Sequence, residues 1–152
     1  MKALELKVPP PAVGLLIAAA MWALSDLLPA TLAVPNPNFA AAVIAVVGIS
    51  FDVFGIVSFR LAKTTINPLR PSKTSSLVSS GIYRITRNPM YVGVLFLLIA
   101  WAIFLSSPWT LLGPLAFVLY MNRFQIGPEE KVLEGLFGDA YLVYKKRVRR
   151  WL

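Results

Sequence analysis

The sequence contains no cysteine and no histidine among its 152 residues. The lack of cysteine excludes disulfides, thiolate nucleophiles and metal sites with sulfur ligands. Because imidazole is missing as well, the chain cannot build a haem site, a structural zinc site or a histidine-based catalytic triad. We therefore expect no metal site. If the chain is an enzyme, its reactive chemistry has to come from a bound cofactor or from the substrate itself.

Charged residues are also scarce, at 14%, against 57% hydrophobic residues and a mean hydropathy of +0.69. Such a composition is typical of a protein whose solvent is lipid. Four segments are long and apolar enough to cross a bilayer, at about residues 11–28, 39–59, 89–105 and 108–124. The third is short, because roughly 17 residues at about 1.5 Å each give about 25 Å. The first does not end in a small-residue cleavage site, so we expect a retained span and not a signal peptide.

The positions of the basic residues predict the orientation of these spans. All fifteen Lys and Arg residues lie at the amino terminus, within residues 60–87, or from Arg123 onward. If the four spans are correct, all fifteen fall on one side, which the positive-inside rule makes the cytoplasmic side. We therefore expect an integral protein of the cell or inner membrane with both termini in the cytoplasm. The net charge of +8 then favours contact with anionic lipids over nucleic acid.

The predicted architecture is all-α and multi-pass, with about four transmembrane helices in two hairpins. We expect one structural domain, in which residues 1–60 form the amino-terminal hairpin. Residues 61–152 hold a cytoplasmic loop, the second hairpin and carboxy-terminal amphipathic helices. The tail carries an apolar stripe at helical spacing, which predicts helices on the membrane surface: Leu133, Phe137, Tyr141, Tyr144, Val148 and Trp151. Gly138-Asp139 predicts a break between two short helices, with Glu129 and Glu130 in the first turn of one.

Three sequence blocks carry a family resemblance: GIYRITRNPMY at residues 81–91, EEKVL at 129–133 and FGDAYLVY at 137–144. In this order and spacing they resemble the isoprenylcysteine carboxyl methyltransferases and the related phospholipid methyltransferases, which are membrane enzymes. The similarity covers about residues 64–152. Asn-Pro-Met-Tyr at 88–91 is similar to the phospholipid branch, whereas the isoprenylcysteine enzymes favour His-Pro-Ser-Tyr.

The resemblance implies S-adenosylmethionine as cofactor, which would leave as S-adenosylhomocysteine, and a lipophilic or lipid-modified methyl acceptor. Carried over by position, the cofactor-binding residues would be Ser76, Leu77, Val78, Tyr83, Asn88, Pro89, Met90, Tyr91, Glu129 and Glu130. The residues suit this ligand on physical grounds too. A glutamate can pair with its ammonium, while backbone N–H groups at the start of the third span, with Arg84 or Arg87, can hold its carboxylate. Tyr83 and Tyr91 can pack against the ligand.

Two arginines are candidate catalytic residues. Arg87 sits at the mouth of the third span, and Arg123 at the inner end of the fourth can orient the polar head of the acceptor. Each also has a simpler interpretation, as a residue that reaches for lipid phosphates or anchors the interface. Asp52 lies inside the second span, where it must face the bundle, pair or be protonated, and Ser50 or Ser58 could satisfy it locally.

Two other functions stay open on the sequence alone. A membrane reductase of the sterol-reductase type would use NADPH, although the paired acids argue against it. A non-enzymatic lipid-binding subunit would not need the long cytoplasmic segment. The acceptor itself can be a carboxylate, an amine or a thiol, and the sequence does not indicate the oligomeric state.

Overall fold

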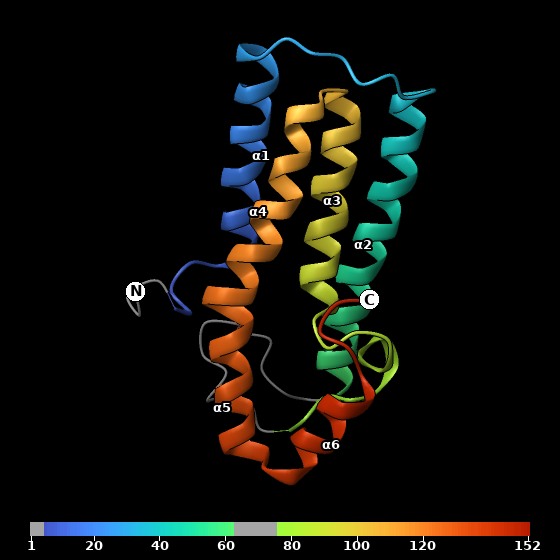
Figure 1. Ribbon diagram of the computed structural model, residues 1–152. Helices are drawn as coiled ribbons and strands as arrows, with labels where there is room; N and C mark the ends of the chain where they lie inside the picture. The colour runs from blue at the N-terminus through green and yellow to red at the C-terminus, as the bar shows by residue number, and fades with distance from the viewer. Residues whose placement is uncertain (1–4, 63–75) are drawn as a thin grey trace.

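The computed structural model describes residues 5–62 and 76–152. In these ranges the chain is helical, with a single isolated bridge between Thr86 and Arg149. The helices lie side by side as a bundle, and those formed by residues 127–147 close its lower end in Figure 1. In chain order the helices are α1 (Pro10–Leu27), α2 (Pro37–Leu61), η3 (Gly81–Arg84), α3 (Pro89–Leu105), η4 (Pro108–Leu111), α4 (Leu112–Tyr120), η5 (Met121–Ile126), α5 (Gly127–Phe137) and α6 (Asp139–Arg147). The all-α prediction is confirmed, while part of the predicted cytoplasmic loop, 63–75, lies outside the described residues.

Within residues 5–62 and 76–152, two helices are long and apolar enough to cross a membrane, namely α1 and α2. Their observed bounds differ from the predicted ones by one or two residues at each end, as expected where helix ends are read from composition. Helix α3 has the predicted bounds, and its 17 residues give about 25 Å of length. A membrane setting is thus supported by two apolar helices, and the four-span arrangement stays a prediction.

The fourth predicted span does not end where the apolar run ends. Helix α4 passes into the π-helical turn η5 and then directly into α5, so one rod runs from Leu112 to Phe137. Pro128 lacks an N–H, and its ring would clash with the carbonyl four residues earlier in a regular α-helix. In the wider π turn the N–H of Gly127 donates to the carbonyl of Asn122 instead, which lets the helix continue through the proline.

The two connections that lack Lys and Arg meet at the upper end of the bundle in Figure 1. The backbone N–H of Leu32, between α1 and α2, donates to the carbonyl of Ser106, between α3 and η4, at 2.7 Å. Ser106 has a left-handed φ of 48° that ends α3 and starts the tight return. The two basic-free connections therefore lie together, while α1 and α2 both pack against α3; the two-hairpin arrangement stays a prediction.

The bundle core joins α1, α3, α4 and η5 through buried side chains that include Met21, Tyr91, Phe117 and Met121. Helix α2 packs on the other side of α3 through close glycine contacts. An added Cβ at Gly48 would come within 2.9 Å of the carbonyl oxygen of Gly93. Small residues of this kind let membrane helices approach closely.

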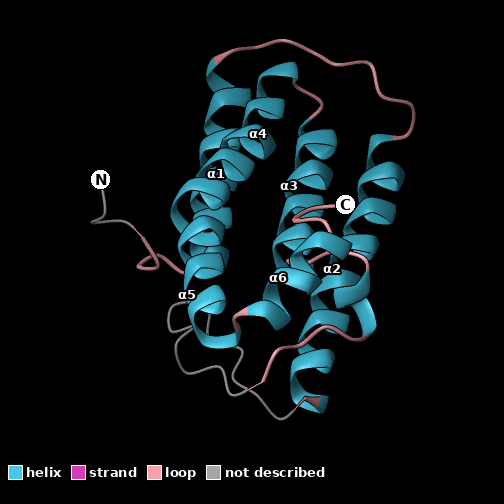
Figure 2. Ribbon diagram, turned by 60° about the horizontal axis from the view of Figure 1, so that its bottom comes forward, coloured by secondary structure: helices cyan, strands magenta, loops and turns pink. Residues whose placement is uncertain are grey.

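The tail folds back as two helices, as predicted, because Gly138 adopts a φ of 50° between α5 and α6. Figure 2 shows α6 turned back toward the end of α2. The prediction that the apolar stripe lies on the membrane surface is wrong. Its middle residues pack inside the protein, in a second cluster that we call the terminal core: Val78, Tyr83, Tyr141, Tyr144 and Val148. The partners come from the segment before α3 and from Phe59 and Ala62 at the end of α2.

Candidate active site

Pro89 begins helix α3, as the sequence predicts, and it occupies the first helical turn. Asn88 before it has φ −130° and ψ 56°, which is not the extended conformation expected before proline. Its backbone and side chain are both tied down, because its N–H donates to Thr86 Oγ1 at 3.2 Å and its Nδ2 donates to the carbonyl of Arg150 at 2.8 Å. These bonds hold Asn88 in the less common geometry.

Two of the first backbone N–H groups of α3 are already used within the chain, contrary to expectation. Tyr91 and Val92 both donate to the carbonyl of Asn88 at 3.0 Å, and Pro89 has no N–H. The nitrogen of Met90 lies near Gly55 of α2, since a Cβ placed on that glycine would lie 3.7 Å from it. Side chains such as Arg87 are therefore the stronger candidates to hold an anion at this end of α3.

The carboxy-terminal residues after α6 form a strap along the segment that leads into α3, which the sequence did not indicate. Arg149 pairs with Thr86 in a parallel bridge, and its carbonyl accepts from the N–H of Arg87 at 2.9 Å. Thr86 is fully buried and donates from its hydroxyl to the carbonyl of Arg150 at 3.1 Å. At the end of the strap, Trp151 Nε1 donates to the side-chain oxygen of Asn122 at 3.1 Å.

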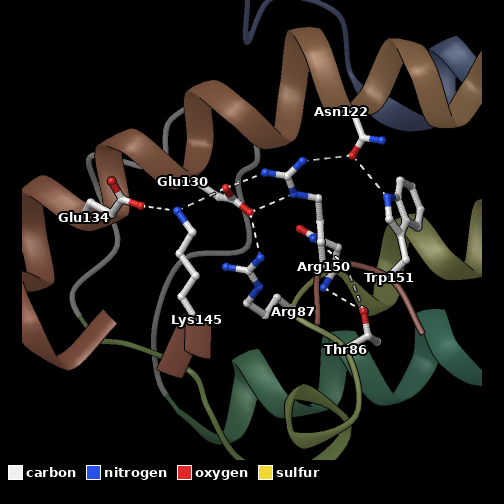
Figure 3. A network of polar contacts seen from close by, with 9 residues as sticks. Thr86, Arg87, Asn122, Glu130, Glu134, Lys145, Arg150 and Trp151 are labelled. Carbon is white, nitrogen blue, oxygen red and sulfur yellow. Dashed lines mark hydrogen bonds and ion pairs between the residues drawn. The ribbon is translucent and has the colours of Figure 1, made fainter. Parts of the chain in front are cut away.

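Glu130 is the centre of an ionic cluster at the lower end of the bundle (Figure 3). Arg150 grips both of its carboxylate oxygens, at 3.0 Å and 2.7 Å. Arg87 lies at 3.1 Å and Lys145 at 3.6 Å from it, and Lys145 also pairs with Glu134. The basic tail thus supplies two of the three cations around this acid.

The pKa of Glu130 is lowered by this cluster. Burial opposes its ionisation, but the hydrogen bonds from Arg150 and the charges of Arg87, Arg150 and Lys145 outweigh burial. Since three cations here meet only Glu130 and Glu134, the cluster keeps one surplus positive charge. Part of this surplus positive charge lies on Arg87, whose side chain is only 9% exposed. The Nε and Nη1 of Arg87 have no hydrogen-bond partner within the described chain.

Glu129 directly precedes Glu130 on α5, but its carboxylate has no cation beside it in the described chain. Its carboxylate accepts a hydrogen bond from the hydroxyl of Tyr91 at 2.9 Å, and it forms no ion pair with any Lys or Arg in residues 5–62 or 76–152. Burial, helped by the charge of Glu130, raises the pKa of Glu129 to about 7 despite the bond from Tyr91. A half-buried carboxylate without a cation is suited to accept one from a ligand.

Aromatic residues of the terminal core lie next to Glu129. Tyr83 is 5% exposed, and its pKa is raised by burial and by the negative charge of Glu129. Its ring packs edge-to-face against Phe59 at 5.4 Å between centroids, and its carbonyl accepts from the hydroxyl of Tyr144 at 2.7 Å. Val78 is buried in the same core, Leu77 is half-buried beside it, and Ser76 Oγ donates to the carbonyl of Ala62 at 3.3 Å.

The structure therefore brings most of the predicted site residues to one end of the bundle, except Arg123. Arg123 lies on η5 with its side chain 52% exposed and pairs with Glu5 at 3.1 Å. Its guanidinium also lies 5.3 Å from the ring centre of Phe124. Four residues of the cluster or strap were missed: Thr86, Asn122, Lys145 and Arg150. Nothing local in the sequence marks them, because their contacts join segments 11 to 64 residues apart.

Asp52 lies against α3, where a Cβ on Gly93 would come within 2.3 Å of its Oδ1. The two serines proposed to satisfy it do not do so in the described chain. Ser50 Oγ donates to the carbonyl of Val46 and Ser58 Oγ to that of Phe54. Asp52 therefore faces the contact between α2 and α3. Tyr91, by contrast, packs in the bundle core with residues of α1 and α4.

The sequence profile of the phospholipid methyltransferase family matches residues 36–140. A protein-S-isoprenylcysteine O-methyltransferase of Xenopus laevis is 34% identical over 115 residues, which cover 69% of this chain and 39% of that enzyme. A methanethiol S-methyltransferase of Pseudomonas deceptionensis is 36% identical over 103 residues, covering 64% of this chain and 35% of the enzyme. An uncharacterized protein of Haemophilus influenzae is 48% identical over 63 residues, which are 41% of this chain and all of that protein. The chain thus spans less than two fifths of the length of these two methyltransferases.

Proposed function

Because the chain belongs to the phospholipid methyltransferase family, we propose that it is a membrane-embedded methyltransferase that uses S-adenosylmethionine. The methyl acceptor is a lipophilic or membrane-partitioned molecule with a carboxylate, amine or thiol as its reacting group. The acceptors of the related enzymes differ in this respect, since their names include a prenylated cysteine and methanethiol. The proposal therefore leaves the acceptor class open and concerns the cofactor first.

The observation that carries this proposal is a pair of incompletely satisfied ionisable groups at one end of the bundle. Arg87 pairs with Glu130 through Nη2, but its buried Nε and Nη1 have no partner in the described chain, and Glu129 has no cation there. The amino-acid part of S-adenosylmethionine carries one carboxylate and one ammonium, so it complements both groups. A buried donor left without a partner costs about 1–3 kcal/mol, and a zwitterionic ligand would remove this cost at Arg87 while it supplies a cation to Glu129.

Glu129 and Glu130 have different roles in this proposal. Glu129 binds the ammonium of the cofactor, since it is half-buried and its single hydrogen bond in the described chain is the one from Tyr91. Glu130 is already neutralised by its cations, so it positions Arg87 and holds the strap. Tyr83 and Tyr91 form the aromatic wall, with Ser76, Leu77 and Val78 behind it and Asn88, Pro89 and Met90 fixing the turn. A ring face near the sulfonium adds about 0.5–2 kcal/mol.

The chemistry needs little from the protein beyond alignment and exclusion of water. When bound, the cofactor would supply a methyl group activated on its sulfonium, which the acceptor's lone pair would attack in line with release of S-adenosylhomocysteine. The residues of the chain hold the donor and the acceptor in this geometry, which contributes several kcal/mol, up to about 7–11 in ideal cases. No general base is required for a carboxylate or thiolate acceptor, which agrees with a chain that has no histidine.

We further propose four spans in two hairpins, with both termini and the candidate site on the cytoplasmic side. The soluble cofactor then enters from the cytoplasm, while the acceptor enters sideways from the lipid. Arg123 lies at the inner end of the fourth apolar segment with half of its side chain exposed, so it is placed to orient the polar head of an acceptor.

Calorimetric titration of the detergent-purified chain with S-adenosylmethionine and S-adenosylhomocysteine tests the cofactor. Glu129→Gln should bind at least about tenfold more weakly, because an ionic hydrogen bond contributes about 1.5–3 kcal/mol. Asp139→Asn is the matched control, since it removes an exposed carboxylate from the start of α6. Equal affinity of all three proteins, or no binding by the unaltered chain, would refute the proposal. Labelled donor incubated with membrane extracts then identifies the acceptor by the molecule that gains the methyl group.

A further inference from the structure

A recess with a volume of about 510 Å³ lies between the segment before α3 and helix α6. Its wall includes Leu77, Arg84, Val143, Tyr144, Arg147 and Val148. None of the acidic residues of the candidate active site, nor Arg87 or Tyr91, lines it. We call this recess the Arg84–Arg147 groove.

The two arginines of the groove are unpaired, unlike their neighbours in the ionic cluster. Arg87 and Arg150 both bind Glu130. Arg84 and Arg147, three residues before each of them, are exposed and form no ion pair or hydrogen bond through their side chains within residues 5–62 and 76–152. Each chain segment therefore presents one arginine inward to a carboxylate and one outward to the groove.

The two arginines come from different segments and line the same recess. Arg84 is the last residue of η3 and Arg147 the last residue of α6, and both belong to the wall of the groove, which contains no acidic residue. Two guanidinium groups on the wall of one recess, with no acid between them, suit an anion with several oxygens, which is the preference of arginine for phosphate.

The rest of the groove is apolar and lies at the depth of lipid headgroups in the proposed membrane arrangement, on which this inference rests. Helix α3 begins at Pro89, three residues after the bridge. Leu77, Val143 and Val148 line the groove, Val143 is 49% exposed, and Ile85 beside Arg84 is 58% exposed. A soluble anion would leave this apolar surface in water, whereas a phospholipid covers it.

We propose that the Arg84–Arg147 groove binds the phosphate of an anionic phospholipid headgroup from the cytoplasmic leaflet. The phosphate lies between the two guanidinium groups, and the glycerol and first acyl carbons lie along the apolar wall. Tyr144 lines the groove and also donates to the carbonyl of Tyr83. A bound lipid therefore rests on the side chain that supports the aromatic wall of the candidate active site.

The test is native mass spectrometry of the full chain in detergent, titrated with phosphatidylglycerol and, separately, with zwitterionic phosphatidylcholine. The double variant Arg84→Gln, Arg147→Gln is compared with Lys146→Gln, Arg149→Gln, which loses the same charge from exposed side chains outside the groove. Each groove arginine should contribute about fivefold to phosphatidylglycerol binding, so the first double variant should bind about 25-fold more weakly. The control pair should change binding by about twofold or less, and the single variant Arg84→Gln should lose about fivefold.

Equal losses in the two double variants would overturn the proposal, because binding would then follow net charge and not the groove. Unchanged binding in both would overturn it as well. Displacement of phosphatidylglycerol by excess inorganic phosphate would show a site for free phosphate and overturn the lipid as its occupant. Thermal unfolding of each variant confirms that it is folded. The assay contains no methyl donor, so failure of cofactor binding and failure of lipid binding are separate results.

Discussion

The pH dependence of cofactor binding gives the sharpest test of Glu129. Burial raises its pKa to about 7, so only about one tenth of the empty sites carry the carboxylate at pH 6. The α-amino group of a free amino acid is still an ammonium at neutral pH, so the ligand keeps its positive charge while Glu129 ionises. Opposite charges therefore meet from about pH 7 upward until the ligand loses its proton, and binding should weaken below pH 7.

The magnitude follows from protonation equilibria. Below pH 7, each unit of pH should weaken binding about tenfold, because the proton on Glu129 has to be removed before the ion pair forms. Calorimetric titration of the unaltered chain at half-unit steps from pH 5.5 to 9 measures this profile. We call the decline of affinity below pH 7 the acid limb of the profile. Glu129→Gln should bind the cofactor weakly at every pH and lose the acid limb, whereas Asp139→Asn should keep it. An acid limb of the same slope in Glu129→Gln would refute the assignment of this residue.

The same pKa shift changes the stability of the empty protein with a defined sign. The folded pKa of about 7 lies above the ordinary value of 4.5, so the contribution of Glu129 is fully present below pH 4.5 and is lost as the pH rises through 7. The loss is up to about 3 kcal/mol. Glu129→Gln should therefore be more stable than the unaltered chain at pH 8 and have nearly equal stability at pH 4.5, measured by thermal unfolding in detergent.

Three further predictions concern positions whose roles differ. Glu130→Gln should destabilise the fold by about 3–5 kcal/mol, because it leaves the buried Arg87 without its acid; an unchanged unfolding temperature would mean that the cluster contributes nothing. Gly93→Ala should destabilise by about 1–3 kcal/mol, since its Cβ would come within 2.3 Å of Asp52 Oδ1, whereas Gly135→Ala meets no atom within 4 Å and should be neutral or slightly stabilising. Equal unfolding temperatures of these two variants would argue against the close α2–α3 contact. Arg123→Ala should lower the turnover of labelled donor more than donor affinity; normal turnover would leave Arg123 as an interfacial anchor.

The helices of this protein could be predicted because their signals are local. Proline marks the start of α3, an unbroken apolar run defines its length, and Gly138 separates α5 from α6 through a positive φ. The family resemblance drawn from residues 81–144 is confirmed by the family profile. It could be recognised because it rests on three short blocks of sequence. The continuation of α4 into α5 was missed because Pro128 normally stops a helix, and a π turn before it is not visible in composition.

The difference between the two adjacent acids could not be predicted, because it depends on distant residues. Glu129 and Glu130 have the same chemistry, and the sequence gives no reason to separate them. Successive residues on a helix point about 100° apart, so one meets Tyr91 of α3 and the other meets Arg87 and the strap. The pKa of one rises and that of the other falls for this reason. The basic composition of the tail likewise did not indicate that Lys145 and Arg150 pair with Glu130.

The candidate site is therefore a product of chain segments that meet only in the folded protein. Three segments contribute its charged side chains. Arg87 comes from the turn before α3, Glu130 from the start of α5 and Arg150 from the strap after α6. Arg87 is held by Glu130, Glu130 by Arg150, and the carbonyl of Arg150 holds Asn88 in place before Pro89. Because these contacts run through the strap, we expect cofactor binding at Glu129 to depend on the strap, although no hydrogen bond or ion pair joins the two in the described chain. A loss of cofactor affinity on changing Arg150 would then come with a shift of the Glu129 acid limb, because the charge of the neighbouring Glu130 would no longer be neutralised.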